Sequence, residues 1–270
     1  MTTRLTIALA ATLLLAGLAA WFVLQRSHSD PNDKTVPHPV PSVGEQPSPS
    51  DLLGKRPPYQ GPVWFVDVTS ETGVVFHHHS GDSPEKPFPS ANGSGLGAVD
   101  YDMDGLYDLY FVTGTDFPID RATSAYHNRF FRNRGKWNFE DVTDQCGLDY
   151  NGYSHGVAVG DYDNDGFPDI YVTCYGANRL FHNLGDGTYR RVEVTAGVAD
   201  ERWAGSAAFF DYDRDGYLDL YVCNYAEWTL EKSLFCGDRA RGVRVYCSPG
   251  SVEPVRDVCI ITKGTARSEW

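Results

Sequence analysis

The sequence predicts an all-β fold in which small four-stranded antiparallel sheets repeat along the chain, as in a β-propeller. Three observations predict it. An acidic nine-residue loop occurs three times, starting at Asp100, Asp161 and Asp211. Strand-like runs rich in β-branched and aromatic residues flank each loop, and two further strand-like motifs recur between loops. Four strands in each repeat of about 40–60 residues are typical of propeller blades.

Each loop reads Asp-Tyr-Asp-x-Asp-Gly-x-x-Asp, with carboxylates at positions 1, 3, 5 and 9 and glycine at position 6. Such close carboxylates repel one another unless a cation lies between them. Oxygen ligands and a sharp glycine turn suit Ca²⁺. A solvated acidic turn could explain one copy, but three copies in one register favour about three calcium sites. The predicted ligands are the carboxylates and one carbonyl per loop: Asp100, Asp102, Asp104, Leu106, Asp108, Asp161, Asp163, Asp165, Phe167, Asp169, Asp211, Asp213, Asp215, Tyr217 and Asp219.

The flanks of the loops indicate a β-hairpin and not a helical calcium hand. An EF-hand closes with a bidentate glutamate at position 12, where this chain has Phe111, Val172 and Val222. A calmodulin-type sensor would also need helix signals around the loops, and none is seen.

Each repeat is expected to supply four strands. These lie before the loop, after the loop, at an Asn-Arg-x-Phe motif and at an Asp/Glu-Val-Thr motif. The strands before the loops are expected at 156–160 and 207–210, and those after the loops at 109–112, 170–173 and 220–223. The Asn-Arg-x-Phe strands are expected at 128–133 and 178–183, and the Asp/Glu-Val-Thr strands at 139–143 and 191–195, with an earlier copy at 65–69.

The formal net charge is −13, and 12 of the 36 acidic residues are loop aspartates. Three bound Ca²⁺ ions would change the charge from −13 to −7 (−13 + 6). Much of the acidity therefore reflects expected metal ligation. Because no basic patch is interleaved with aromatic residues, nucleic-acid binding is disfavoured.

The N-terminal residues predict export. Arg4 precedes an uncharged run over residues 5–24, which is long for a signal-peptide core and close to a membrane span. We favour an uncleaved signal anchor over residues 1–26, facing outside the cytoplasm; a cleaved signal giving a periplasmic or secreted protein stays open. Residues 27–62 are rich in Pro and Ser and predict an extended linker.

Export permits disulfides among the six cysteines. Cys236 and Cys247 flank a Gly/Arg-rich stretch and are the favoured pair. Cys174 and Cys223 follow successive loops one residue out of register, which favours buried free thiols over a bridge.

No catalytic residue is predicted, because no nucleophile elbow or phosphate loop occurs. His77 and His79 would share one strand face, and a surface role is favoured over metal binding. His155 and His182 are expected to form hydrogen bonds between blades. Three aromatic residues are expected in the blade core: Trp203, Tyr225 and Trp228.

Several longer segments resemble a known family. They are residues 76–81, 93–97, the three loops, 175–188, 207–216 and the cysteine insertion through 246–249. Residues 63–257 resemble FG-GAP (VCBS) repeats, as in integrin α-subunits, and more narrowly the exported ASPIC/UnbV group related to cartilage acidic protein. This resemblance implies a calcium-binding propeller outside the cell, usually of seven blades.

The divergent tail, residues 258–270, departs from that pattern, because residues 258–264 replace an expected strand pair. About three to four blades are present, so we expect an incomplete ring. A truncated propeller is favoured; an arc closed by another chain and a marginally stable protein are the alternatives.

The resulting expectation is an exported, non-catalytic calcium-binding scaffold for adhesion or protein interaction. Its partner would be a protein or a cell-surface glycan, with membrane attachment if the N-terminal segment is retained. The alternative is the propeller part of a calcium-dependent extracellular polysaccharide-processing enzyme.

Overall fold

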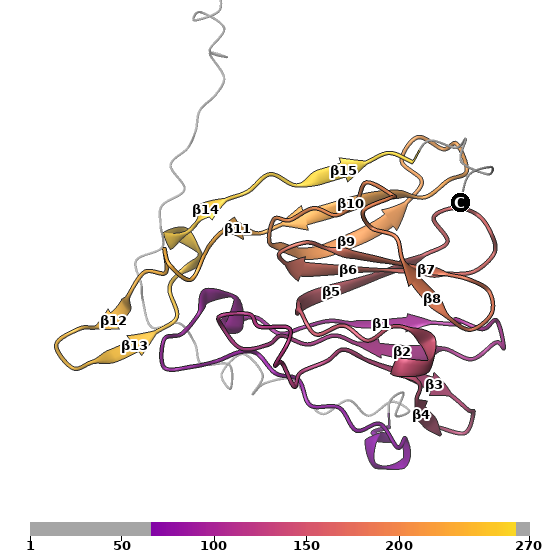
Figure 1. Ribbon diagram of the computed structural model, residues 1–270, viewed down its shortest axis with the longest axis horizontal. Helices are drawn as coiled ribbons and strands as arrows, with labels where there is room; N and C mark the ends of the chain where they lie inside the picture. The colour runs from indigo at the N-terminus through magenta and orange to yellow at the C-terminus, as the bar shows by residue number, and fades with distance from the viewer. Residues whose placement is uncertain (1–65, 263–270) are drawn as a thin grey trace, which may run out of the picture. The chain divides into compact units, whose positions relative to one another are not determined.

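The computed structural model describes residues 66–262 (Figure 1). The predicted signal or anchor at 1–26 and the predicted linker at 27–62 lie outside the described residues. The described residues all belong to one compact unit. Among the described residues, no helix is both long enough and apolar enough to cross a membrane.

The first sheet has the strand order β1-β2-β3-β4, and every neighbouring pair is antiparallel. Its strands are Leu96–Val99, Asp108–Phe111, Arg129–Asn133 and Phe139–Asp141. The first acidic loop joins β1 to β2, because Val99 pairs with Asp108. The hairpin predicted around this loop is therefore present.

The second sheet repeats this arrangement in the order β5-β6-β7-β8. Its strands are Tyr153–Gly160, Asp169–Tyr175, Arg179–Asn183 and Tyr189–Arg191. Gly160 pairs with Asp169 around the second loop, just as Val99 pairs with Asp108 around the first. The two sheets therefore share one register.

The third sheet has the order β15-β10-β9. Its strands are Val258–Ile260, Asp219–Asn224 and Ala204–Phe210. Ile260 pairs with Leu220, in the same register in which Phe131 pairs with Leu109 in the first sheet. Residues 258–260 thus supply the third strand of this sheet, which extends past the predicted repeat boundary at residue 257.

The Asp-Val-Thr motifs end strands and do not form them. Strand β4 stops at Asp141, whose Oδ1 accepts the amide of Thr143 at 3.0 Å, and the helical turn α3 (Thr143–Cys146) follows. At the earlier copy, Asp67 accepts the amide of Thr69 at 2.9 Å, and the 3-10 turn η1 (Thr69–Glu71) follows. An aspartate that bonds the amide two residues ahead bends the chain. At the third copy, strand β8 (Tyr189–Arg191) ends where the motif begins. The strand predictions over 139–143, over 191–195 and at 66–69 are wrong to this extent.

The core lies between neighbouring sheets. One cluster joins Val99, Tyr110 and Phe130 of the first sheet to Ile170 and Phe181 of the second. A second cluster joins the opposite face of the second sheet to the third, and it contains Ala158, Tyr171, Leu180, Leu220 and Val222. Apolar burial on both faces of the middle sheet holds the three sheets together.

Residues 226–254 form an insertion at one end of the third sheet (Figure 1). It contains two two-stranded ladders, β11 (Ala226–Glu227) with β14 (Glu253–Pro254) and β12 (Cys236–Asp238) with β13 (Val243–Val245), and the 3-10 turn η3 (Pro249–Ser251). The 3-10 turn η2 (Phe88–Ala91), from an earlier part of the chain, packs against it through Phe88. Cys236 and Cys247 are joined by a disulfide.

Aromatic residues pack this insertion against the sheets. Trp203 and Trp228 are buried in one cluster with Phe88, which confirms the core positions predicted for both tryptophans. Tyr225 is 38% exposed, so the prediction is wrong for this residue.

The described residues thus form three antiparallel sheets packed face to face, which Figure 1 shows stacked in chain order from β1 to β15. The first two sheets have four strands each, as propeller blades do, and the third has three. No closed ring is formed by residues 66–262.

Candidate metal centres

Backbone conformation gives all three acidic loops the same shape. Position 4 has a left-handed backbone in each loop, with φ of 57° at Met103 and 63° at Arg214. The glycine at position 6 is also left-handed, with φ of 87° at Gly105 and 96° at Gly166. No atom would lie within 4 Å of a Cβ at either glycine. Glycine is therefore needed for its backbone angle and not for space.

The carboxylates at positions 1 and 5 fix the loop through main-chain amides. The position 6 amide donates to the position 1 carboxylate, at 3.0 Å from Gly105 to Asp100 and at 2.9 Å from Gly166 to Asp161. The position 7 amide donates to the position 5 carboxylate, at 2.9 Å from Leu106 to Asp104, with the same distance in the other two loops. Each loop is therefore ordered by its own aspartates.

The position 9 aspartate ties the loop to its sheet, and Asp108, Asp169 and Asp219 are fully buried. One oxygen of Asp108 accepts the Tyr101 amide at 3.2 Å, and the other accepts the Asn133 amide at 2.7 Å. The same two bonds recur at Asp169 and Asp219, whose strand partners are the amides of Asn183 and Thr262. One oxygen is thus held by the loop and the other by the third strand of the sheet.

These constraints bring carboxylate oxygens together in every loop. Four groups have one ligand atom from each residue within 4.8 Å of the others: Asp100, Asp102 and Asp108; Asp161, Asp163 and Asp165; Asp163, Asp169 and His182; and Asp211, Asp213 and Asp219. Asp104 and Asp215 do not belong to these groups. The carbonyl groups of Leu106, Phe167 and Tyr217 stay predictions as ligands.

Three carboxylate oxygens in the clusters are buried without a hydrogen-bond partner. They are Asp100 Oδ1, Asp102 Oδ1 and Asp163 Oδ1. A buried charged acceptor without a partner carries a large desolvation cost. A hard cation coordinated by oxygen would remove that cost, so the donor set of these loops fits Ca²⁺.

Burial without a cation disturbs the ionisation of the position 9 aspartates. Burial raises the pKa of Asp108 to about 6, although the amides of Asn133 and Tyr101 favour its charged form. Burial likewise raises the pKa of Asp169 to about 6. It also raises the pKa of Asp163, with the carboxylate of Asp165 adding to the effect. Lost solvation disfavours the charged form of all three, and nearby carboxylates add to this effect at Asp108 and Asp163 only.

The three centres differ at one position at the end of the third strand. It is the residue just before Asn133, Asn183 or Thr262, whose amides donate to the position 9 aspartates. At the first loop this residue is Arg132, which forms ion pairs with Asp102 and, at 3.5 Å, with Asp104. At the second loop it is His182, whose Nδ1 lies 3.1 Å from Asp169 Oδ1; this bond raises the pKa of His182. At the third loop it is Ile261. The predicted hydrogen bond of His182 between blades is therefore wrong, because its partner lies in the same sheet.

Side-chain amides connect successive loops across sheets. Asn183 Nδ2 in the second sheet donates to the carbonyl of Tyr101 in the first loop at 2.9 Å. Asn164 Nδ2 in the second loop donates to the carbonyl of Gly216 in the third at 2.7 Å. Asn183 ends the Asn-Arg-x-Phe segment of its repeat and Asn164 occupies the variable position 4 of its loop, and sequence reasoning gave neither of them a role.

The other singled-out histidines lie away from the clusters. His79 Nε2 contacts Asp116 at 2.7 Å, and its ring stacks on Tyr126 at 3.5 Å; His77 is exposed. The carbonyl of His155 accepts the Gly95 amide from the neighbouring sheet at 2.6 Å. Its ring is buried, which lowers the pKa of His155 to about 4. The hydrogen bond predicted for His155 between blades is thus present at its main-chain carbonyl.

The cysteines outside the disulfide are free thiols. Cys146 and Cys174 are buried, Cys223 is half-buried and Cys259 is exposed. The interpretation of Cys174 as a buried free thiol agrees with its position in the core between the first two sheets.

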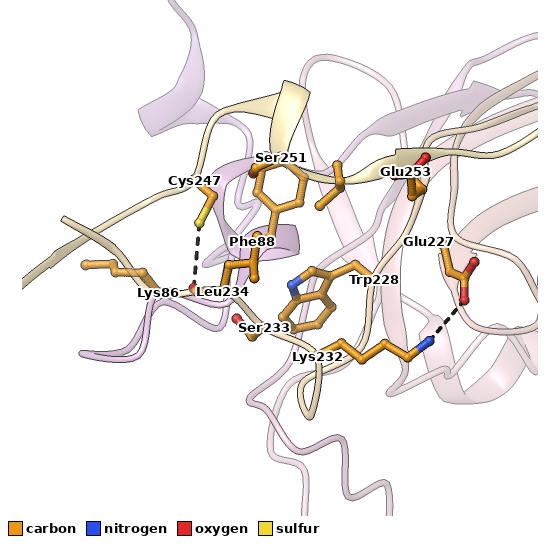
Figure 2. A pocket seen from close by; sticks show the side chains of 11 residues that line it. Lys86, Phe88, Glu227, Trp228, Lys232, Ser233, Leu234, Cys247, Ser251 and Glu253 are labelled. Atoms are coloured by element: carbon orange, nitrogen blue, oxygen red, sulfur yellow. Dashed lines mark hydrogen bonds and ion pairs between the residues drawn. The ribbon is translucent and has the colours of Figure 1, made fainter.

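A separate pocket of about 180 Å³ lies under the insertion (Figure 2). Figure 2 shows the rings of Phe88 and Trp228 within it and Lys232 reaching Glu227, whose carboxylate lies 3.4 Å from Lys232 Nζ. Glu253 also lines the pocket and faces Glu227 in register across the β11–β14 ladder. Sequence reasoning missed this pocket, because its walls come from segments more than 100 residues apart.

Comparison with known proteins supports the repeat seen in the three hairpins. No curated protein matches the chain. A family model described as FG-GAP-like repeat matches twice, over residues 100–172 and 162–222. All three acidic loops lie within these matches. The chain therefore contains FG-GAP-like repeats, which here form the sheets that carry the candidate metal centres.

Proposed function

We propose that this chain is an exported, calcium-stabilised scaffold for binding a protein or a cell-surface glycan, and that it belongs to the ASPIC/UnbV group. FG-GAP-like repeats form interaction domains of the β-propeller type. In this proposal Ca²⁺ neutralises the clustered aspartates and fixes the three hairpins. The loops and the residues beside them are then presented rigidly to a partner.

The unpartnered oxygens of Asp100, Asp102 and Asp163 carry the calcium proposal. The second oxygen of each residue does have a partner: the amide of Gly105 for Asp100, Arg132 for Asp102 and His182 for Asp163. A solvated acidic turn would leave such oxygens exposed to water. The asparagine bridges between loops would transmit the order of one centre to the next.

Titration calorimetry of metal-free protein with Ca²⁺ tests the proposal. The wild type should bind about three ions, whereas Asp163→Asn should lose one of them because it removes an inward-facing charged oxygen. Asp144→Asn is the matched control, since Asp144 is exposed and outside the loops; its binding should equal that of the wild type. Absence of calcium binding by the folded wild type would reject the proposal.

A polysaccharide-processing enzyme is the second candidate, and the pocket of Figure 2 is the observation in its favour. Paired carboxylates beside an aromatic ring are a common arrangement for sugar cleavage, and Glu227 and Glu253 face each other there. A screen of acidic and neutral polysaccharides with calcium would test this function. Turnover that Glu227→Gln abolishes would support it, and no turnover on any of them would leave the scaffold.

A further inference from the structure

The three sheets can be compared position by position by counting from the first aspartate of each loop. On one face, the first sheet has Gly97, Val99, Tyr101, Tyr110 and Phe130. The second sheet has Ala158, Gly160, Tyr162, Tyr171 and Leu180 at these positions, and the third has Ala208, Phe210, Tyr212, Tyr221 and Cys259. We call this surface the trailing face of each sheet.

The trailing faces of the first two sheets are buried under the sheet that follows. Val99 and Tyr101 are 1% and 5% exposed beneath the second sheet. On the third sheet the equivalent residues, Phe210 and Tyr212, are 38% and 66% exposed. No part of residues 66–262 covers this face. The third sheet therefore has an apolar face at the positions that form the established interface between sheets.

The first strands of the sheets also approach one another through small residues. A Cβ at Gly95 would lie 3.2 Å from Gly156 Cα, and a Cβ at Gly156 would lie 3.4 Å from Ser206 Cα. Ser206 is the equivalent residue of the third sheet, and it is exposed. Ala208, at the position of Gly97, is exposed as well. The third sheet thus keeps the small side chains that permit close approach of a further strand.

The opposite, leading face of the first sheet has the complementary character. Leu96 is 50% exposed and Ala98 is exposed. Their equivalents in the second sheet, Val157 and Val159, pack against the core between the first two sheets. Phe76 contacts Phe111 at 4.9 Å and covers part of this face. The uncovered part of this leading face has apolar side chains like those with which the second sheet packs against the trailing face of the first.

We propose that a second copy of this chain covers the trailing face of the third sheet with the leading face of its first sheet. The contact is head-to-tail, so each copy uses two different surfaces. It continues an interface that the fold already forms twice. Two copies would bring six sheets together, within the range of about four to eight blades that propellers contain.

The register of the proposed contact follows from the existing one. A Cβ at Gly97 would lie 2.5 Å from Val157 Cγ1, so these positions touch where the first sheet meets the second. Ala208 is equivalent to Gly97, and Leu96 is equivalent to Val157. Ala208 of one copy should therefore lie against Leu96 of the other.

Sedimentation equilibrium of the full chain tests this contact. The wild type should have twice the 30.0 kDa mass of one chain. Ala208→Arg and Leu96→Glu should each halve the measured mass, because each places an unpaired charge in the contact. The chain carrying both substitutions should regain it, since opposite charges then meet across both contacts. Val194→Arg, at a residue that is 78% exposed elsewhere, is the matched control and should leave the mass unchanged.

Regained mass in the doubly substituted chain would show that the single variants had not failed to fold. A wild type that is monomeric at micromolar concentration would overturn the proposal, because the trailing face of the third sheet would then not be covered by a second copy. An effect of Ala208→Arg without one of Leu96→Glu would also overturn it, because that result indicates a symmetric contact between two trailing faces. Both outcomes are independent of calcium binding.

Discussion

Raising the pH should destabilise the metal-free protein, and Ca²⁺ should reverse this trend. Burial raises the pKa of Asp108 and of Asp169 from 3.8 to about 6. Because the native pKa exceeds the unfolded pKa, the native state binds more protons between these values. The free energy of unfolding therefore falls as the pH rises from about 4 to about 6.

The size of this fall follows from the two shifts. Each shift is about 2 pKa units, and one unit corresponds to about 1.4 kcal/mol. Full titration of one group would thus lower the free energy of unfolding by about 3 kcal/mol. His182 acts in the same direction, because a raised histidine pKa gives stability that is lost as the pH rises through the folded pKa. Carboxylates with lowered pKa, such as Asp200, lose their stabilising effect only at lower pH.

Denaturant unfolding of metal-free protein between pH 4.5 and 7 provides the assay. The wild type should lose stability over this range, whereas a variant with Asp108→Asn and Asp169→Asn should lose much less. Saturating Ca²⁺ should remove the loss in the wild type, because a bound cation favours the charged carboxylates. Equal pH dependence of the wild type and the double variant would refute this reasoning.

Three further predictions concern single residues. Asp102→Ala should remove one calcium site and leave the other two intact in a calorimetric titration. Tyr171→Phe should lower the free energy of unfolding by about 0.5–1.5 kcal/mol, because it removes the 3.0 Å bond from the buried hydroxyl to the carbonyl of Val198, which then keeps only the amide of Asp200 as donor. Tyr221→Phe, at the same repeat position, removes a bond from its hydroxyl to the exposed carboxylate of Asp257 and should cost clearly less in the same denaturant experiment; an equal cost would contradict this comparison. Asn183→Ala should lower the thermal midpoint, since it removes two hydrogen bonds: one that its side chain donates to the carbonyl of Tyr101 in the first loop and one that it accepts from the amide of Gly185. An unchanged midpoint would contradict a stabilising role of this link between sheets.

The hairpins could be predicted because each repeat is encoded locally. The loop aspartates, the glycine and the flanking β-branched runs lie within a short segment, and their spacing alone sets which oxygens meet. The hairpins that join β1 to β2 and β5 to β6 followed from that spacing. The third strands at 128–133 and 178–183 were found for the same reason.

Contacts between distant segments could not be predicted. Strand β15 carries none of the Asn-Arg-x-Phe motif, yet it takes the third position because its alternating apolar residues meet Leu220 across the sheet. The Asp-Val-Thr motifs favour strands by composition, but the aspartate side chain competes for the next amides and ends the strand. The partner of His182 is decided by the sheet register, which places it over Asp169.

The number of calcium ions bound at equilibrium tests the central claim most directly. Metal-free protein should be dialysed against a low millimolar concentration of Ca²⁺, and its bound calcium should be counted by elemental analysis. The account predicts about three ions per chain, and one fewer after Asp163→Asn. A folded chain that retains none would contradict it.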